Sequence, residues 1–245
     1  MITVRAEGLK VVTEDLLKVE RQIPFALALA NTRMAKLIQA GEISVMRKRL
    51  DKPTATTLNS VFVKPGTKAK PEAKVWLKDT WGSGIPADKY MRPAVYGGVR
   101  GHKRFEKALI AKGFMPDNQY AIPSKDYLDA NGNIRGQLAM RILSGLGAAE
   151  TVSGTTANAS NSRRSRKKGN ADRYFVGEVD GINGVWERRR MALGVAVKPV
   201  FVFTKAPRYK VRVPFFKIAE NMIKAHYDRE FAKAMSTALA SARPR

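Results

Sequence analysis

Apolar residues recur every three or four positions in two long stretches, one near each end of the chain. The first stretch follows Ile23-Pro24-Phe25, and the second follows Val213-Pro214-Phe215. Their spacing matches the 3.6-residue period of an amphipathic helix. Because proline is tolerated at the first helical position, each proline is expected to begin a long helix. The apolar positions of the first stretch are Ile23, Leu27, Ala30, Met34, Leu37, Ile38, Gly41 and Val45, and those of the second run from Phe215 to Leu239.

The first long helix is expected to begin at Pro24, after a separate short helix over Thr13–Arg21. Its last turn contains Arg47-Lys48-Arg49, whose positive charge complements the helix dipole. Pro53 then prevents the helix from continuing. At about 1.5 Å per residue, such a helix would be roughly 40 Å long.

Alternating and β-branched segments between the two helices predict strands. The predicted strands are residues 58–63, 73–77, 174–179, 184–188 and 195–203. Pro65-Gly66 in the first connection and Asp180–Asn183 in the third have the composition of hairpin turns, so two antiparallel hairpins are expected. Two further helices are predicted over residues 102–112 and 134–146, the first ending at Gly113.

Residues 147–172 show no apolar period and are rich in Ser, Thr, Ala, Asn, Gly, Arg and Lys. This composition is typical of a flexible basic loop or arm. The whole pattern predicts an α+β fold, with long N-terminal and C-terminal amphipathic helices packed on an antiparallel sheet. One domain covering residues 1–245 is expected.

Composition excludes several classes of protein. The 245 residues contain no cysteine, so disulfides and thiolate metal sites are excluded. The first residues, Met1–Glu7, lack the apolar core of a signal peptide, and no run is long and apolar enough to span a membrane. A soluble protein with no membrane partner is therefore expected.

Charge is the most unusual property of the chain. Lys and Arg number 45 against 21 Asp and Glu, which gives a net charge of +24. Such a field favours nucleic acid or other anionic partners. The densest basic run supplies the candidate nucleic-acid-binding residues, which are Arg163, Arg164, Arg166, Lys167 and Lys168.

No pattern in the sequence selects a catalytic site. The two histidines, His102 and His226, are isolated from one another and are better explained as structural residues. Asp129–Asn133 resembles the start of a calcium loop, but Ile134 replaces the required glycine and Met140 replaces the bidentate glutamate, so a simple turn is expected. We therefore expect no catalytic residue, no cofactor and no metal, and the protein is not predicted to be an enzyme.

The two ends of the chain resemble a known family. Gln22–Asn31 resembles the opening of minor tail protein Z, the tail-completion family of lambda-like tailed phages. Arg49–Thr54 with Leu58–Ser60, followed by Ala73-Lys74-Val75, is similar to prophage relatives of that family. So is the closing segment, in which Arg208–Val211 and Val213-Pro214-Phe215 lead into a long basic helix. The middle of the chain, including the basic insert, has no counterpart.

The resemblance implies a virion component in the tail or neck region, made in the host cytoplasm. A member of this family would cap the finished tail or join it to the head as one subunit of a ring. The implied partners are other copies of the chain, portal or connector proteins, and tail-tube or tail-terminator proteins. Packaged DNA would be contacted through its phosphates without sequence reading. The family has no catalytic residues to transfer.

Two other hypotheses remain open from the sequence. The strong positive charge also fits a free nucleic-acid-binding protein that recognises no particular sequence. An enzyme such as a nuclease is the weakest alternative, because no spacing of carboxylates selects a site.

Overall fold

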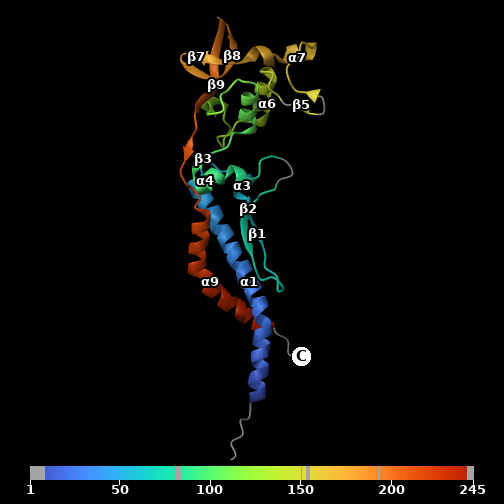
Figure 1. Cartoon of the computed structure of the whole chain (residues 1–245), viewed down its shortest axis with the longest axis vertical. Coiled ribbons are helices and arrows are strands. Elements are labelled where there is room, and N and C mark those ends of the chain that lie inside the picture. Colours follow the sequence, from blue (N-terminus) through green and yellow to red (C-terminus); the bar gives the residue numbers. More distant parts are fainter. Residues whose placement is uncertain (1–8, 81–83, 150, 153–154, 193, 242–245) are drawn as a thin grey trace, which may run out of the picture. The chain divides into compact units, whose positions relative to one another are not determined.

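The computed structural model describes residues 9–80, 84–149, 151–152, 155–192 and 194–241 (Figure 1). The fold is mixed α+β, as the sequence predicted. Contacts divide the chain into two compact units rather than the one domain expected over residues 1–245. A terminal unit comprises residues 1–96 and 211–245, and a central unit comprises residues 97–210. The division arises because each unit has its own apolar core.

The terminal unit is built on two long helices, α1 (Leu9–Arg49) and α9 (Phe215–Ala240), which run alongside one another (Figure 1). Small residues allow the two backbones to approach, and Ala30, Ala234 and Ala238 are fully buried. The Tyr227 hydroxyl donates a hydrogen bond to Asn31 Oδ1 at 3.1 Å, which ties α9 to α1. The prediction of long helices near both ends is confirmed.

Neither proline begins its helix in the way the sequence suggested. Pro24 lies inside α1, so the separate helix predicted over Thr13–Arg21 is wrong. Pro214 occupies the N-cap of α9, one position before the first helical residue. An interior proline removes one backbone hydrogen bond, and the buried residues that follow it, Ala26 and Ala30, anchor the helix beyond that defect. The continuous α1 is therefore about 60 Å long rather than 40 Å.

A two-stranded hairpin packs against α1. Strand β1 (Val61–Lys64) pairs antiparallel with β2 (Lys74–Leu77), which confirms the first predicted hairpin. The predicted strand began too early, because a short helix, α2 (Ala55–Leu58), precedes β1. Two more short helices follow, α3 (Ala87–Tyr90) and α4 (Arg92–Tyr96). The core of this unit consists of Met46, Val61, Met91, Val95, Val213 and Phe215.

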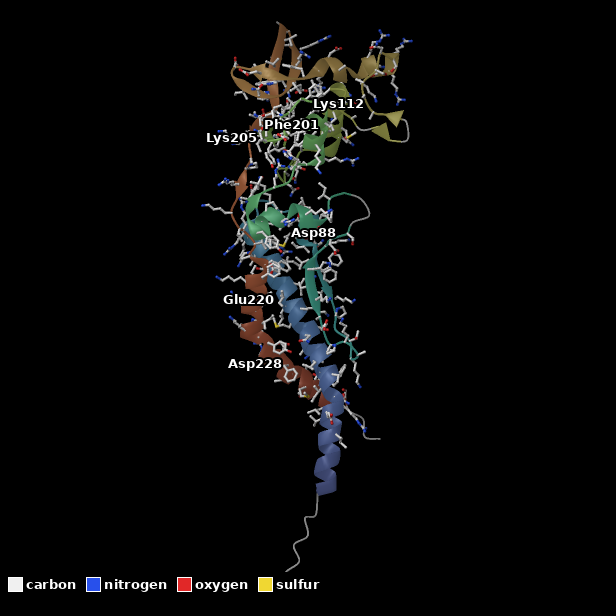
Figure 2. The ribbon with its side chains drawn as sticks, in the orientation of Figure 1. Asp88, Lys112, Phe201, Lys205, Glu220 and Asp228 are labelled. Carbon is white, nitrogen blue, oxygen red and sulfur yellow. The ribbon has the colours of Figure 1, made fainter. Side chains whose placement is uncertain are left out.

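The central unit contains a four-stranded antiparallel sheet in the order β4-β9-β8-β7. Helices α5 and α6 contribute Leu109 and Ile142 to its core, and Phe201, labelled in Figure 2, is also buried there. The long helices thus pack on the small hairpin, while the larger sheet has helices of its own. The elements are β4 (Gln119–Pro123), β7 (Tyr174–Val179), β8 (Ile182–Met191), β9 (Gly194–Lys205), α5 (Arg104–Ala111) and α6 (Gly136–Gly145).

The connection between β7 and β8 is the tight turn that its sequence predicted. Asp180 and Gly181 both have positive φ, 51° and 74°, as a type I′ hairpin turn requires. Gly184, just beyond the turn, lies so close to β9 that an added Cβ would come within 2.1 Å of the Phe201 carbonyl oxygen. Glycine at this position therefore allows β8 and β9 to pair closely. The unit also contains a small two-stranded pairing of β3 (Gly98–Val99) with β10 (Arg208–Tyr209) and the 3-10 turn η1 (Lys125–Tyr127).

The segment predicted as a flexible loop, residues 147–172, contains regular structure. Strand β5 (Thr151–Val152) pairs with β6 (Thr155–Thr156), and two short helices follow, α7 (Arg163–Lys168) and α8 (Asn170–Arg173). Ser162 caps α7 by accepting a hydrogen bond from the Ser165 N–H at 3.2 Å. Gly169 ends the helix with a φ of 62°. Serine and glycine are also common in loops, so the composition of this segment did not indicate helix α7.

Candidate nucleic-acid interface

Strands β8 and β9 continue beyond their neighbours as a two-stranded ribbon. Strand β7 pairs with β8 only as far as Glu187, and β4 pairs with β9 only from Phe201 onward. Past these points β8 and β9 pair with each other alone, ending at Met191 opposite Gly194. We call residues Arg188–Met191 and Gly194–Val197 the basic ribbon, because three consecutive arginines lie on one of its strands.

The basic ribbon and helix α7 line one shared hollow, which we call the basic groove. Its volume is about 720 Å³. Seven of its lining residues are cationic and only Asp172 is acidic. The lining residues are Arg166, Lys167, Lys168, Gly169, Asp172, Arg173, Arg188, Arg189, Arg190, Met191 and Val195.

A buried carboxylate holds two of the groove's arginines. Glu187 is 1% exposed and accepts hydrogen bonds from Arg173 Nε at 2.5 Å, from Arg189 Nε at 3.0 Å and from the Tyr127 hydroxyl. Burial alone would raise the pKa of Glu187, but these three donors outweigh burial and lower it. Burial of the Tyr127 hydroxyl, together with its hydrogen bond to the negatively charged Glu187, raises the pKa of Tyr127 to about 12. Glu187 is therefore ionised at neutral pH and fixes both guanidinium groups.

Arg188 is positioned by contacts with a neighbouring strand and helix. Its guanidinium lies 4.2 Å from the centre of the Phe175 ring, a cation–π contact. Its Nη1 donates a hydrogen bond to the Asp172 carbonyl oxygen at 3.0 Å. In the part of the chain that the structure describes, the charge of Arg188 therefore has no carboxylate partner.

Four cations of the basic groove have no partner among the described residues. Within the described part of the chain, Arg166, Lys167, Lys168 and Arg190 make neither a hydrogen bond nor an ion pair through their side chains. All four are exposed. Positive charges gathered without counter-charges attract an external anion, and a chain of phosphates satisfies several of them at once.

Three of the five residues predicted to bind nucleic acid line this groove. Arg166, Lys167 and Lys168 do so, whereas Arg163 and Arg164 lie on α7 outside the lining. Arg173 and the run Arg188–Arg190 also line the groove but were not predicted to bind nucleic acid. The triple arginine was visible in the sequence, but only the strand register shows that it extends past the sheet toward α7.

Other candidate residues have structural roles. His102 stacks on Tyr120 with ring centres 4.4 Å apart, and its Nε2 lies 3.0 Å from the Gln119 carbonyl oxygen. Asp129 accepts hydrogen bonds from the Asn131 and Asn133 N–H groups, both at 2.9 Å, which is the simple turn expected there. Among the described residues, no group of three or more acidic or histidine side chains could hold a metal ion.

Two more glutamates are buried, with opposite surroundings. Glu106 is 1% exposed and receives two hydrogen bonds from Arg100, at 2.5 and 2.6 Å, and one each from the Lys103 and Ala121 N–H groups. Burial would raise the pKa of Glu106, but these donors lower it. Glu42 on α1 is fully buried, and no described residue donates a hydrogen bond to either of its carboxylate oxygens. Burial raises the pKa of Glu42 to about 8.

Comparison with known proteins leaves the function open. No family model matches this chain, and neither the curated proteins nor the solved structures include one that matches it. Across the described residues, no helix is both long and apolar enough to cross a membrane.

Proposed function

We propose that the chain is a structural subunit of a tailed-phage particle, located at the joint between head and tail, and that its basic groove binds nucleic acid through phosphates. In this role the protein assembles with copies of itself and with connector or tail proteins. It turns over no substrate.

The observation that carries the binding part of the proposal is the basic groove. It gathers seven cations around one hollow with a single acidic residue. Three of the seven are held in place by Glu187, Phe175 and the Asp172 carbonyl, so part of the positive surface is preformed. Preformed cations lose less conformational entropy when they bind a phosphate than freely rotating ones do.

The phage setting is supported by the terminal segments. Gln22–Asn31 and Val213-Pro214-Phe215 carry the resemblance to tail-completion proteins. The first segment lies in α1 and the second leads into α9, the two helices that frame the terminal unit. A long rigid helix pair suits a subunit that packs side by side with its neighbours. The net charge of +24 suits a place beside packaged DNA.

Two measurements test the two parts of this proposal. Mass spectrometry of purified phage particles should detect the chain at a few tens of copies or fewer, and light scattering should detect multimers of the purified protein. Fluorescence anisotropy at low salt should detect binding to a labelled oligonucleotide. A chain that is missing from purified particles would contradict the structural role, and a lack of binding at low salt would contradict the role of the groove.

The same groove also favours a second candidate, a free nucleic-acid-binding protein that acts outside particles. The two candidates differ in where the protein accumulates. A free binder would stay in the lysate when particles are sedimented, whereas a head–tail joining subunit would sediment with them.

A further inference from the structure

The basic ribbon exposes apolar side chains beside its arginines. Val195 is 64% exposed and Val197 is 43% exposed. In the strand register Arg190 lies opposite Val195, and Arg188 lies opposite Val197, so all four share one face of the ribbon. Exposed valines that lie opposite arginines are not explained by phosphate binding alone, because phosphates offer no apolar surface.

The dimensions of the ribbon match a groove of duplex DNA. Two paired strands lie about 4.8 Å apart, and four residues of a strand span roughly 13 Å. The major groove of B-form DNA is about 12 Å wide and admits a two-stranded ribbon. It presents acceptor atoms of guanine, which arginine binds, and thymine methyl groups, which valine can contact.

The lining of the groove argues against single strands as its main ligand. Proteins that bind single strands stack the bases on aromatic side chains. None of the described residues that line the basic groove is aromatic. The ring of Phe175 on β7 is covered by the guanidinium of Arg188, which lies 4.2 Å from the ring centre.

We propose that the basic ribbon enters the major groove of duplex DNA, while Arg166, Lys167 and Lys168 on α7 contact the phosphates that border it. This inference rests on the proposed function, in which the basic groove binds nucleic acid. Arg190 and Arg188 then face the base edges, and Val195 and Val197 contact thymine methyl groups and sugar edges.

Competition between nucleic acids tests the ligand class. Unlabelled duplex DNA, duplex RNA and single-stranded DNA of the same sequence compete for the purified protein against a labelled DNA duplex. Duplex DNA should compete at least tenfold better than duplex RNA, because the major groove of A-form RNA is too deep and narrow for side chains to read. Bound protein should also protect guanine N7, in the major groove, from dimethyl sulfate more than it protects adenine N3, in the minor groove.

A charge-neutral variant separates the ribbon from simple phosphate attraction. The double substitution Val195→Ser and Val197→Ser should weaken binding to duplex DNA about fivefold to tenfold with an unchanged salt dependence. The matched control, Val211→Ser, removes a valine that is 48% exposed in the terminal unit and should bind like the unsubstituted protein.

The failure of this inference differs from the failure of the proposed function. Equal competition by all three nucleic acids, or protection of adenine N3 alone, would overturn insertion of the ribbon while binding to phosphates persists. Loss of binding to every nucleic acid at low salt would overturn both.

Discussion

The guanidinium of Arg173 and the carboxylate of Glu187 lie 2.5 Å apart and join the end of α8 to strand β8. The same carboxylate accepts hydrogen bonds from Arg189 and Tyr127. One buried acid thus links the helical segment after residue 147 to the sheet. The basic groove depends on this link, because α7 and the basic ribbon form its two sides.

Replacing Glu187 with glutamine should destabilise the central unit by about 2 kcal/mol, because the hydrogen bonds from Arg173 and Arg189 lose their ionised acceptor. Both arginines are partly exposed, so water solvates their charges in the variant and limits the loss. The pKa of Glu187 is lowered from its ordinary 4.5, so its contribution is present at neutral pH and is lost as the pH falls below that value. Urea unfolding of Glu187→Gln and the unsubstituted protein at pH 7 and pH 3.5 measures both effects. A matched control is Asp126→Asn, which removes an exposed partner of Lys198 and should leave stability unchanged. Equal stability of Glu187→Gln and the unsubstituted protein at pH 7 would contradict this role.

Replacing Glu42 with methionine should stabilise the terminal unit at neutral pH. The pKa of Glu42 is raised from 4.5 to about 8, so between these pH values the unfolded chain is ionised here while the folded chain keeps its proton. Stability therefore falls as the pH rises through this range, by on the order of 3 kcal/mol at pH 7. Unfolding free energies at pH 4.5 and pH 7.5 should differ less in Glu42→Met than in the unsubstituted protein. The same pH dependence in both proteins would show that Glu42 gains a partner or solvent.

Replacing Arg100 with methionine should destabilise the central unit by about 3 kcal/mol, because it leaves the buried charge of Glu106 without its bidentate partner. Adding Glu106→Gln should recover part of the loss, since it removes the buried charge, while its single amide oxygen can accept from only one of the Lys103 and Ala121 N–H groups, which donate to different carboxylate oxygens of Glu106. A double-mutant cycle by chemical denaturation measures the coupling. Additive effects of the two substitutions would mean that the pair is not coupled.

Local signals in the sequence predicted much of the fold. Asp180-Gly181 specified a hairpin turn, and Gly113, with a φ of 72°, follows the end of α5 as expected. Pro24 misled the prediction, because a proline that can begin a helix can also lie inside one when buried residues beyond it, here Ala26 and Ala30, anchor the helix. The two-unit division was not predictable from local patterns, because it depends on which core each strand joins.

The candidate site was only partly predictable for a similar reason. The basic residues of α7 form a visible run, and three of them line the groove. Arg190 was hidden in a strand whose extension past the sheet follows from pairing between β8 and β9. The contact between Tyr127 and Glu187 joins residues 60 positions apart, and nothing local indicates it.

The salt dependence of DNA binding by a matched pair of variants tests the central claim most directly. One variant is Arg166→Gln, Lys167→Gln and Lys168→Gln, at the end of α7, and the other is Arg47→Gln, Lys48→Gln and Arg49→Gln, at the end of α1. Both remove three adjacent exposed cations from the last turn of a helix. If the basic groove binds phosphates, the first variant should bind duplex DNA more weakly and lower the slope of log K against log salt by about 0.9 for each lost contact, while the second behaves like the unsubstituted protein. Equal losses in both variants would contradict the account, because net charge alone would then explain binding.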